Sequence, residues 1–140
     1  MVFVLAVGTF AGVVGERKRR KALAKYFART CTGFQWRRRF PAASKTEIRA
    51  FLDLFIEAFL FRRKHRLLFS PKDRVMDVYH ACYPPDWSLG DNMELEEFVE
   101  DFRKTYSIDL VPLWREDITL GDLFALTQQR IEPHSGANAG

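Results

Sequence analysis

The chain has 140 residues, of which 47% are hydrophobic and thirteen are phenylalanine. This length suits one modest domain with extensions, and the composition favours a mostly helical core rich in Phe. The only two cysteines, Cys31 and Cys82, form no Cys-x-x-Cys pair. The cysteine spacing therefore predicts neither a zinc site nor a secretory disulfide framework.

The charge is divided unevenly along the chain. Residues 1–75 contain eighteen Lys and Arg against five acids, whereas residues 76–140 contain four against thirteen. A basic half is typical of a solvated face, of binding to an anionic membrane surface, or of binding to nucleic acid. An acidic half predicts a basic partner.

Residues 1–15 carry no charge, and the basic run from Arg17 to Lys21 follows after Glu16. Cations on the carboxyl side of an apolar segment predict an N-terminus outside the cell membrane and a cytoplasmic body. Fifteen helical residues span only about 22 Å of a hydrocarbon core of about 30 Å. We favour a membrane anchor. The alternative is a buried packing segment, in which case the protein would be cytoplasmic. A cleaved signal is least favoured, because no basic residue precedes the apolar stretch.

Residues 16–43 are predicted to form a basic linker that contains interleaved aromatic residues. Near an anionic membrane surface, each cation contributes about 1 kcal/mol. Nucleic acid is the rival ligand, although no RNA-recognition, zinc-finger or helix-turn-helix signature is present. A solvated linker without a ligand is about as favoured as the membrane surface. The candidate residues for binding an anionic surface are Arg17, Lys18, Arg19, Arg20, Lys21, Arg37, Arg38 and Arg39.

A capping box of Ser44 and Glu47 predicts a helix that continues to residue 63. Its apolar residues surround most of its circumference, which is typical of a helix at the centre of a core. Asp53 and Glu57 are one turn apart. We interpret them as exposed helix charges, because no other residue completes an acid-base or metal site.

The run Ser70-Pro71-Lys72-Asp73 predicts another helix start, with Ser as the cap and Pro at the first helical position. This helix continues through Cys82 and stops before Pro84-Pro85. His80 and Cys82 are two residues apart and face different sides of a helix. They are therefore expected to pack structurally and not to form a catalytic or metal site.

A third capping pattern, Asp91 with Glu94, begins an acidic helix over residues 91–106. Its apolar stripe includes Phe98 and Phe102, and acidic residues occupy the other faces. After a short extended link, Thr119 and Asp122 cap a last helix that is expected to end near residue 129. Residues 131–140 are small and polar and are expected to form a flexible tail.

The segment from Ser70 to Gln129 resembles the acyl carrier protein family, in which an Asp-Ser-Leu motif begins an acidic helix and a Thr-led helix follows. Aligning the aromatic positions places Asp91-Asn92-Met93 on that motif. The resemblance implies an all-α fold, a small acyl-carrier-like helical bundle over residues 44–130. Carrier proteins attach phosphopantetheine to the serine, and the amide of Asn92 cannot form that phosphodiester. Ser88, within Asp86-Trp87-Ser88-Leu89, is the alternative attachment site.

The predicted function is a non-catalytic interaction module, tethered at the cytoplasmic membrane face and docking a basic protein partner through helix 91–106. Electrostatic docking of this kind sets specificity and association rate and weakens with salt. The alternatives are a genuine phosphopantetheine carrier that uses Ser88 and a nucleic-acid-binding protein with a basic arm. No enzyme motif is found, and neither a metal nor another cofactor is expected. The predicted partner-binding residues are Asp91, Glu94, Glu97, Glu100 and Asp101.

Overall fold

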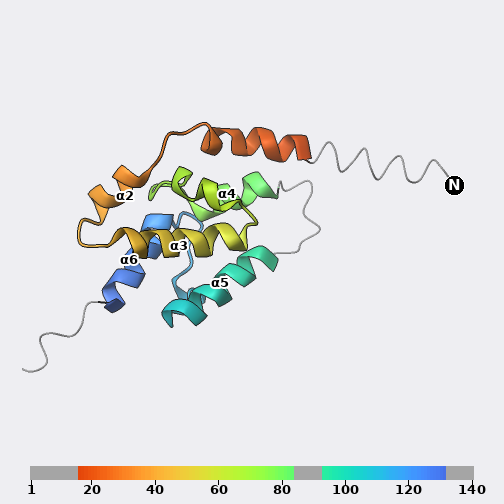
Figure 1. Cartoon of the computed structure of the whole chain (residues 1–140). Helices are drawn as coiled ribbons and strands as arrows, with labels where there is room; N and C mark the ends of the chain where they lie inside the picture. The colour runs from red at the N-terminus through yellow and green to blue at the C-terminus, as the bar shows by residue number, and fades with distance from the viewer. Residues whose placement is uncertain (1–15, 84–92, 132–140) are drawn as a thin grey trace, which may run out of the picture.

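The computed structural model describes residues 16–83 and 93–131, and these residues form helices joined by turns (Figure 1). Within these ranges there is no strand, and the one β-bridge joins Arg74 to Thr119. The predicted all-α class is therefore confirmed. Residues 16–27 are helical and precede α2 (Gly33–Arg39), α3 (Lys45–Ala58), η1 (Arg63–Leu68), α4 (Val75–Cys82), α5 (Met93–Tyr106), η2 (Val111–Leu113) and α6 (Leu120–Ile131).

Helix α3 lies at the centre of the molecule and packs against η1 and α5 (Figure 1). The predicted capping box begins it: Glu47 N donates to Ser44 Oγ at 3.1 Å, and Ser44 N donates to Glu47 Oε2 at 2.7 Å. Apolar residues on several sides of α3 are buried, as expected for a central helix. They are Ile48, Phe51, Leu52, Phe55, Ile56 and Ala58.

The carboxyl end of α3 differs from the prediction, because the helix stops at Ala58 and not at residue 63. Leu60 adopts a left-handed conformation with φ of 61°. Leu60 N donates to Glu57 O, and Phe61 N donates to Ile56 O at 2.8 Å. These two bonds are those of a Schellman motif, a helix end that usually requires glycine. Because position 60 is a leucine and not a glycine, the sequence does not indicate that the helix ends here.

The core is built mainly from aromatic rings. Phe55 of α3 has three ring neighbours, with centroid distances of 5.0 Å to Phe59 at the end of α3, 5.3 Å to Phe69 after η1 and 5.9 Å to Phe98 of α5. Such tilted and edge-to-face pairs contribute beyond the area that they bury. The fully buried aromatic side chains are Trp36, Phe51, Phe55, Phe59, Phe69, Phe98, Phe102 and Phe124.

Residues 16–43, described above as a basic linker, also contribute to this core. Leu23, Tyr26 and Trp36 are buried, and Ala22 and Phe27 pack against the same cluster. Along residues 16–27, the apolar side chains recur with helical spacing, so they face inward while most cations face solvent.

The prediction that a helix begins at Ser70 is wrong, because α4 begins at Val75. Residues 70–73 form a turn in which the Asp73 carboxylate accepts from Ser70 N at 2.7 Å. The chain cannot continue this turn as a helix because distant residues bind it. Leu120 N donates to Asp73 O at 2.9 Å, and Val75 N donates to Ile118 O at 3.0 Å.

Helices α5 and α6 follow the prediction more closely. Phe98 and Phe102 of α5 are buried, while the cap residue Asp91 lies outside the described residues. The capping pair of α6 is confirmed, since Asp122 N donates to Thr119 Oγ1 and Thr119 N donates to Asp122 Oδ2, both at 3.1 Å. Helix α6 ends at Ile131, two residues beyond the expected end.

Within residues 16–83 and 93–131, no helix combines the length and apolar character needed to cross a membrane. The predicted anchor, residues 1–15, lies outside these ranges, as do residues 132–140 of the predicted tail.

Candidate functional site

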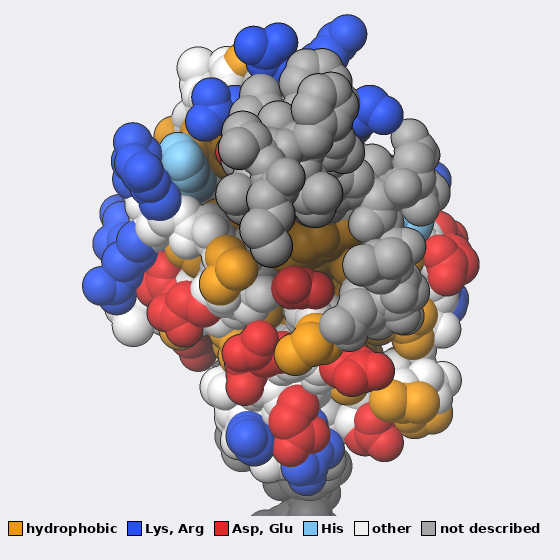
Figure 2. Space-filling model, turned by 90° about the vertical axis from the view of Figure 1, so that its right-hand side faces the viewer, with side chains coloured by type: hydrophobic (Ala, Val, Ile, Leu, Met, Phe, Trp, Pro, Cys, Tyr) orange, Lys and Arg blue, Asp and Glu red, His pale blue; other side chains and the backbone are white. Residues whose placement is uncertain are grey.

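The acidic face of α5 is the first candidate site. Phe98 and Phe102 direct one side of this helix into the core, and Glu96 and Glu97 are exposed on the other. Asp101 is half-buried. None of these three carboxylates has an ion-pair partner among the described residues. Figure 2 shows acidic side chains gathered over the middle and lower part of one face, with Lys and Arg concentrated along its upper and left margins.

Two of the predicted partner-binding residues already have partners within the chain. Glu100 accepts from Arg103 Nε at 3.0 Å and lies 4.0 Å from Lys104 Nζ. The hydrogen bond from Arg103 lowers the pKa of Glu100. The second residue, Glu94, shares a side-chain hydrogen bond with Tyr83. Burial raises the pKa of Tyr83, and the charge of Glu94 and this hydrogen bond raise it further.

The open carboxylates are therefore Glu96, Glu97 and Asp101, and Glu96 was absent from the predicted set. Glu96 lies one helical turn before Glu100, and this spacing could have assigned it to the outward face of the helix. Asp91, Asn92 and Ser88 lie outside the described residues, so the structure does not place them relative to this face.

The eight predicted surface cations are distributed among separate places. Arg17, Arg20 and Lys21 are exposed on the helix of residues 16–27, as is Lys18, whereas Arg19 is half-buried. Arg37 lines a cavity of about 140 Å³ together with Lys45 and Arg49. Arg38 and Arg39 line a different and larger cleft.

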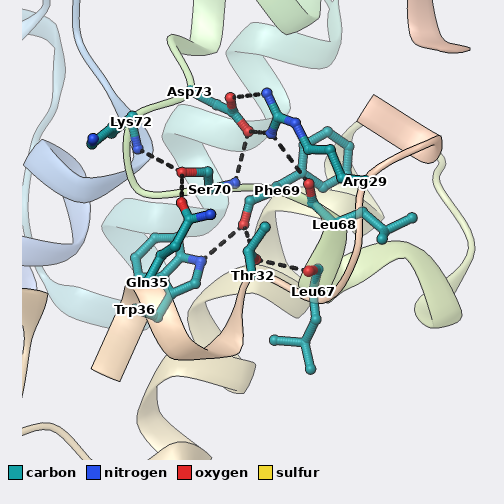
Figure 3. Close-up of polar contacts among 10 residues, drawn as sticks. All are labelled: Arg29, Thr32, Gln35, Trp36, Leu67, Leu68, Phe69, Ser70, Lys72 and Asp73. Carbon is teal, nitrogen blue, oxygen red and sulfur yellow. Dashed lines mark hydrogen bonds and ion pairs between the residues drawn. The ribbon is translucent and has the colours of Figure 1, made fainter. Parts of the chain in front are cut away.

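That cleft is the second candidate site, and part of its lining belongs to a polar network around the turn of residues 70–73, which Figure 3 shows. Arg29 donates to both carboxylate oxygens of Asp73, at 2.6 and 2.9 Å. The hydrogen bond to Asp73 raises the pKa of Arg29 despite partial burial. Ser70 Oγ donates to Gln35 Oε1 at 2.7 Å and accepts from Lys72 N at 3.2 Å.

Thr32 and Trp36 tie the preceding residues into the same network (Figure 3). Thr32 Oγ1 is placed 2.7 Å from Leu67 O and 2.8 Å from Phe69 O, and Trp36 Nε1 donates to Phe69 O at 2.8 Å. Both side chains are fully buried or nearly so. Burying polar groups requires that they be paired, so these bonds fix the course of residues 67–73.

The cleft itself has a volume of about 950 Å³. Its lining contains four cations and one carboxylate, and α2 and the turn at residues 70–73 supply most of it. The lining residues are Arg29, Phe34, Gln35, Arg38, Arg39, Ser70, Pro71, Lys72 and Asp73. Sequence patterns did not predict this cleft, because residues 34–39 and 70–73 are distant in the chain.

The other sequence candidates do not assemble into a site. His80 is exposed and Cys82 is buried, and burial raises the pKa of the Cys82 thiol to about 11. The prediction that Asp53 is an exposed helix charge is wrong. Its side chain is largely buried and lies 3.1 Å from Arg66 and 3.6 Å from Arg63. In the described part of the chain, no His, Cys, Asp and Glu side chains form a group that could hold a metal ion.

Comparison with known proteins gave no match to a family model, to a curated protein or to a solved structure.

Proposed function

We propose that this protein is a non-catalytic interaction module with an acyl-carrier-like bundle, and that it docks a basic protein partner on the outward face of α5. The observation that carries the proposal is the set of open carboxylates on that face. Glu96, Glu97 and Asp101 lack ion-pair partners among the described residues, while Phe98 and Phe102 anchor the helix from behind. A negative surface of this kind attracts a basic partner and raises its association rate.

The order of the elements supports the acyl-carrier-like part of the proposal. Helix α4 is followed along the chain by acidic α5, by a link that contains η2, and by Thr-led α6. We match α4 to the first helix of the family, and α3, which packs directly on α5, supplies further packing for the bundle.

The proposed role is binding alone, because Asn92 stands where the family has its modified serine. The competing hypothesis, a carrier that uses Ser88, predicts a covalent phosphopantetheine group. We expect an unmodified intact mass for protein purified from its native host or from cells that supply a broad phosphopantetheinyl transferase. A mass increment that disappears in Ser88→Ala would replace the binding role with a carrier role.

Charge reversal on α5 tests the docking surface. We expect the triple variant Glu96→Lys, Glu97→Lys and Asp101→Lys to lose the partners that wild-type protein captures by chemical crosslinking in its native host. Capture by the wild type should also weaken with added salt. A matched control reverses three exposed acids elsewhere: Glu57, Glu116 and Asp117.

Circular dichroism and thermal melting should show that both triple variants remain folded, because five of the six altered side chains are exposed and the sixth, Asp101, is only half-buried. Capture that is equal in the two variants would remove α5 as the docking surface. Capture lost only in the control variant would place docking elsewhere on the molecule.

Tethering at the cytoplasmic face of the cell membrane belongs to the same proposal, and it is supported by Arg17, Arg20 and Lys21, exposed directly after residues 1–15. We expect Arg17→Gln, Arg20→Gln and Lys21→Gln together to weaken sedimentation with phosphatidylserine vesicles. The control variant replaces three exposed cations elsewhere, Lys45, Arg49 and Arg62, with Gln. The nucleic-acid alternative is less favoured, because Tyr26 and Trp36 are buried and Phe34 is the one exposed ring of the basic arm, whereas binding of a single strand uses several stacking rings.

A further inference from the structure

We propose that the cleft between α2 and the turn at residues 70–73 binds a small phosphate monoester that carries a planar ring, as a nucleoside monophosphate does. The phosphate would lie between Arg38 and Lys72, and the ring against Phe34. This site is separate from the face of α5, so the two proposals stand or fall independently.

The size and composition of the cleft suit such a ligand. Its volume of about 950 Å³ lies within the range of small-molecule sites, about 300 to 1,000 Å³. Its lining combines an apolar ring with cations and with the polar side chains of Ser70 and Gln35. Small-molecule sites commonly pair apolar surface with a few polar groups that fix orientation.

The charge balance of the cleft leaves two cations without a partner. Arg29 is neutralised by Asp73 at 2.6 Å. Arg39 reaches Asp122 at 3.4 Å. Arg38 and Lys72 have no ion-pair partner among the described residues. Two unpaired positive charges match a phosphate monoester, which carries roughly −1.5 to −2 near neutral pH.

The walls that carry these two cations are fixed in place before any ligand binds. Lys72 belongs to the turn that is held by Gly121 N donating to Pro71 O and by Leu120 N donating to Asp73 O, both at 2.9 Å. Arg38 belongs to α2, which Trp36 anchors in the core. A site whose backbone is already ordered loses little conformational entropy on binding.

Gly121 permits the close approach between α6 and this turn. A Cβ atom at Gly121 would lie 2.7 Å from Pro71 O and would also collide with the Arg39 guanidinium. Arg39 Nη1 donates to Pro71 O at 3.3 Å, and its guanidinium lies 5.4 Å from the Phe40 ring centroid. Arg39 therefore braces the wall, which leaves Arg38 and Lys72 to hold the ligand.

Phe34 supplies the apolar surface at the cleft. It is 66% exposed, whereas every other phenylalanine among the described residues is buried or partly buried. An exposed aromatic ring beside unpaired cations provides a face on which a planar ring can stack. Inorganic phosphate should therefore bind more weakly than a ligand that has both groups.

The test is isothermal titration calorimetry of the full chain with AMP, inorganic phosphate and adenosine. We expect AMP to bind most tightly, phosphate more weakly, and adenosine weakest. Arg38→Gln and Lys72→Gln should each weaken AMP binding about tenfold, the usual effect of losing a hydrogen bond to a charged group. Phe34→Ala should weaken AMP but leave phosphate unchanged.

Arg37→Gln is the matched control. It removes the same charge from the neighbouring residue of the same helix, but Arg37 lines the smaller cavity with Lys45 and Arg49. We expect its AMP affinity to stay within about twofold of wild type, since a remote exposed charge is screened by salt. A larger loss in Arg37→Gln than in Arg38→Gln would move the anion to the smaller cavity and overturn this site.

Four other results would also overturn the proposal. The first is that AMP shows no saturable binding at millimolar concentration, and the second is that adenosine binds as tightly as AMP. The third is that the Arg38→Gln, Lys72→Gln double variant keeps full AMP affinity. The fourth is that the protein binds anionic vesicles or single-stranded DNA but not AMP. The affinity should also rise as pH passes upward through about 6, where a phosphate monoester loses its second proton. A flat profile from pH 5 to pH 7.5 would contradict a phosphate contact.

Discussion

The segment of residues 67–73, which includes the turn at residues 70–73, and helix α5 border the same core, but different forces hold them. This segment is fixed by hydrogen bonds and an ion pair from Arg29, Thr32 and Trp36. Helix α5 is held by the rings of Phe98 and Phe102, which pack against Phe51, Phe55 and Phe59, while its polar side chains face outward.

This difference has a physical consequence for each site. Hydrogen bonds are directional, so they fix the atoms of the turn to within fractions of an ångström, as a small-molecule cleft requires. Apolar packing is non-directional and scales with the area buried, so it leaves the outward face of α5 free to carry charges, as the proposed docking surface requires. Four predictions test this contrast, in order of decreasing effect.

Truncating an α5 ring should produce the largest loss of stability. Phe102→Ala removes a fully buried side chain, so we expect the free energy of unfolding to fall by about 3 to 5 kcal/mol. Urea denaturation followed by circular dichroism measures this change. The control Glu97→Ala, on the outward face of α5, should change it by less than about 0.5 kcal/mol. Equal effects would mean that rings do not anchor α5.

Removing the Asp73 carboxylate should give the next largest loss. Asp73→Ala leaves the buried Ser70 N without its acceptor and Arg29 without its partner. Because Arg29 is 34% exposed and can reach water, we expect a loss of about 2 kcal/mol, below that for a fully buried pair. The exposed Asp77→Ala is the control for urea denaturation. A loss no larger than in this control would show that the turn does not depend on the network.

Thr32→Val should cost about 1 kcal/mol, the usual net value of a buried hydrogen bond. The shape of the side chain is kept, and the two acceptors retain other donors, since Thr32 N donates to Leu67 O and Trp36 Nε1 donates to Phe69 O. Amide hydrogen exchange should show faster opening at residues 67–73 than in α5. Uniform acceleration through both segments would contradict the separation between them.

Acid should weaken the polar region slightly through Asp122, which joins α6 to Arg39. Partial burial would raise the pKa of Asp122, but hydrogen bonds with Thr119 and the charges of Arg39 and Arg115 outweigh it, so the pKa is lowered. The resulting stability is present above the unfolded pKa of about 3.9 and is lost as pH falls through the lower folded value. Asp122 is 35% exposed, so we expect less than about 1 kcal/mol.

The measurement compares wild type with Asp122→Asn by urea denaturation between pH 6 and pH 2. The difference in unfolding free energy should be largest near pH 6 and should shrink in acid. A difference that is constant over this range would assign the effect of the substitution to shape and not to charge.

Much of the fold could be predicted from local patterns. The capping pairs Ser44 with Glu47 and Thr119 with Asp122 are confirmed because each pair is satisfied within one helical turn. Phe98 and Phe102 could be assigned to the core from their spacing alone. Ser70 and Asp73 gave an equally strong local signal, yet that prediction was wrong, because Arg29, Leu120 and Ile118 compete for the same turn from far along the chain.

The candidate sites show the same limit. The acidity of α5 was evident from the sequence, but the internal partners that occupy Glu94 and Glu100 were not, and Glu96 was missed. The cationic cleft could not be predicted, because its two walls lie more than thirty residues apart, as the bond from Ser70 to Gln35 shows. The left-handed Leu60 that ends α3 was also hidden, since this position usually calls for glycine.

The turn at residues 70–73 also constrains the order in which contacts form during synthesis on the ribosome. Its contacts with residues 29–39 can form as soon as those two segments have emerged. Its contacts with Leu120 and Gly121 cannot form until the start of α6 leaves the exit tunnel. Until α6 emerges, contacts from residues 29–39 alone hold the turn of a nascent chain, and the bonds from Leu120 and Gly121 are added afterwards.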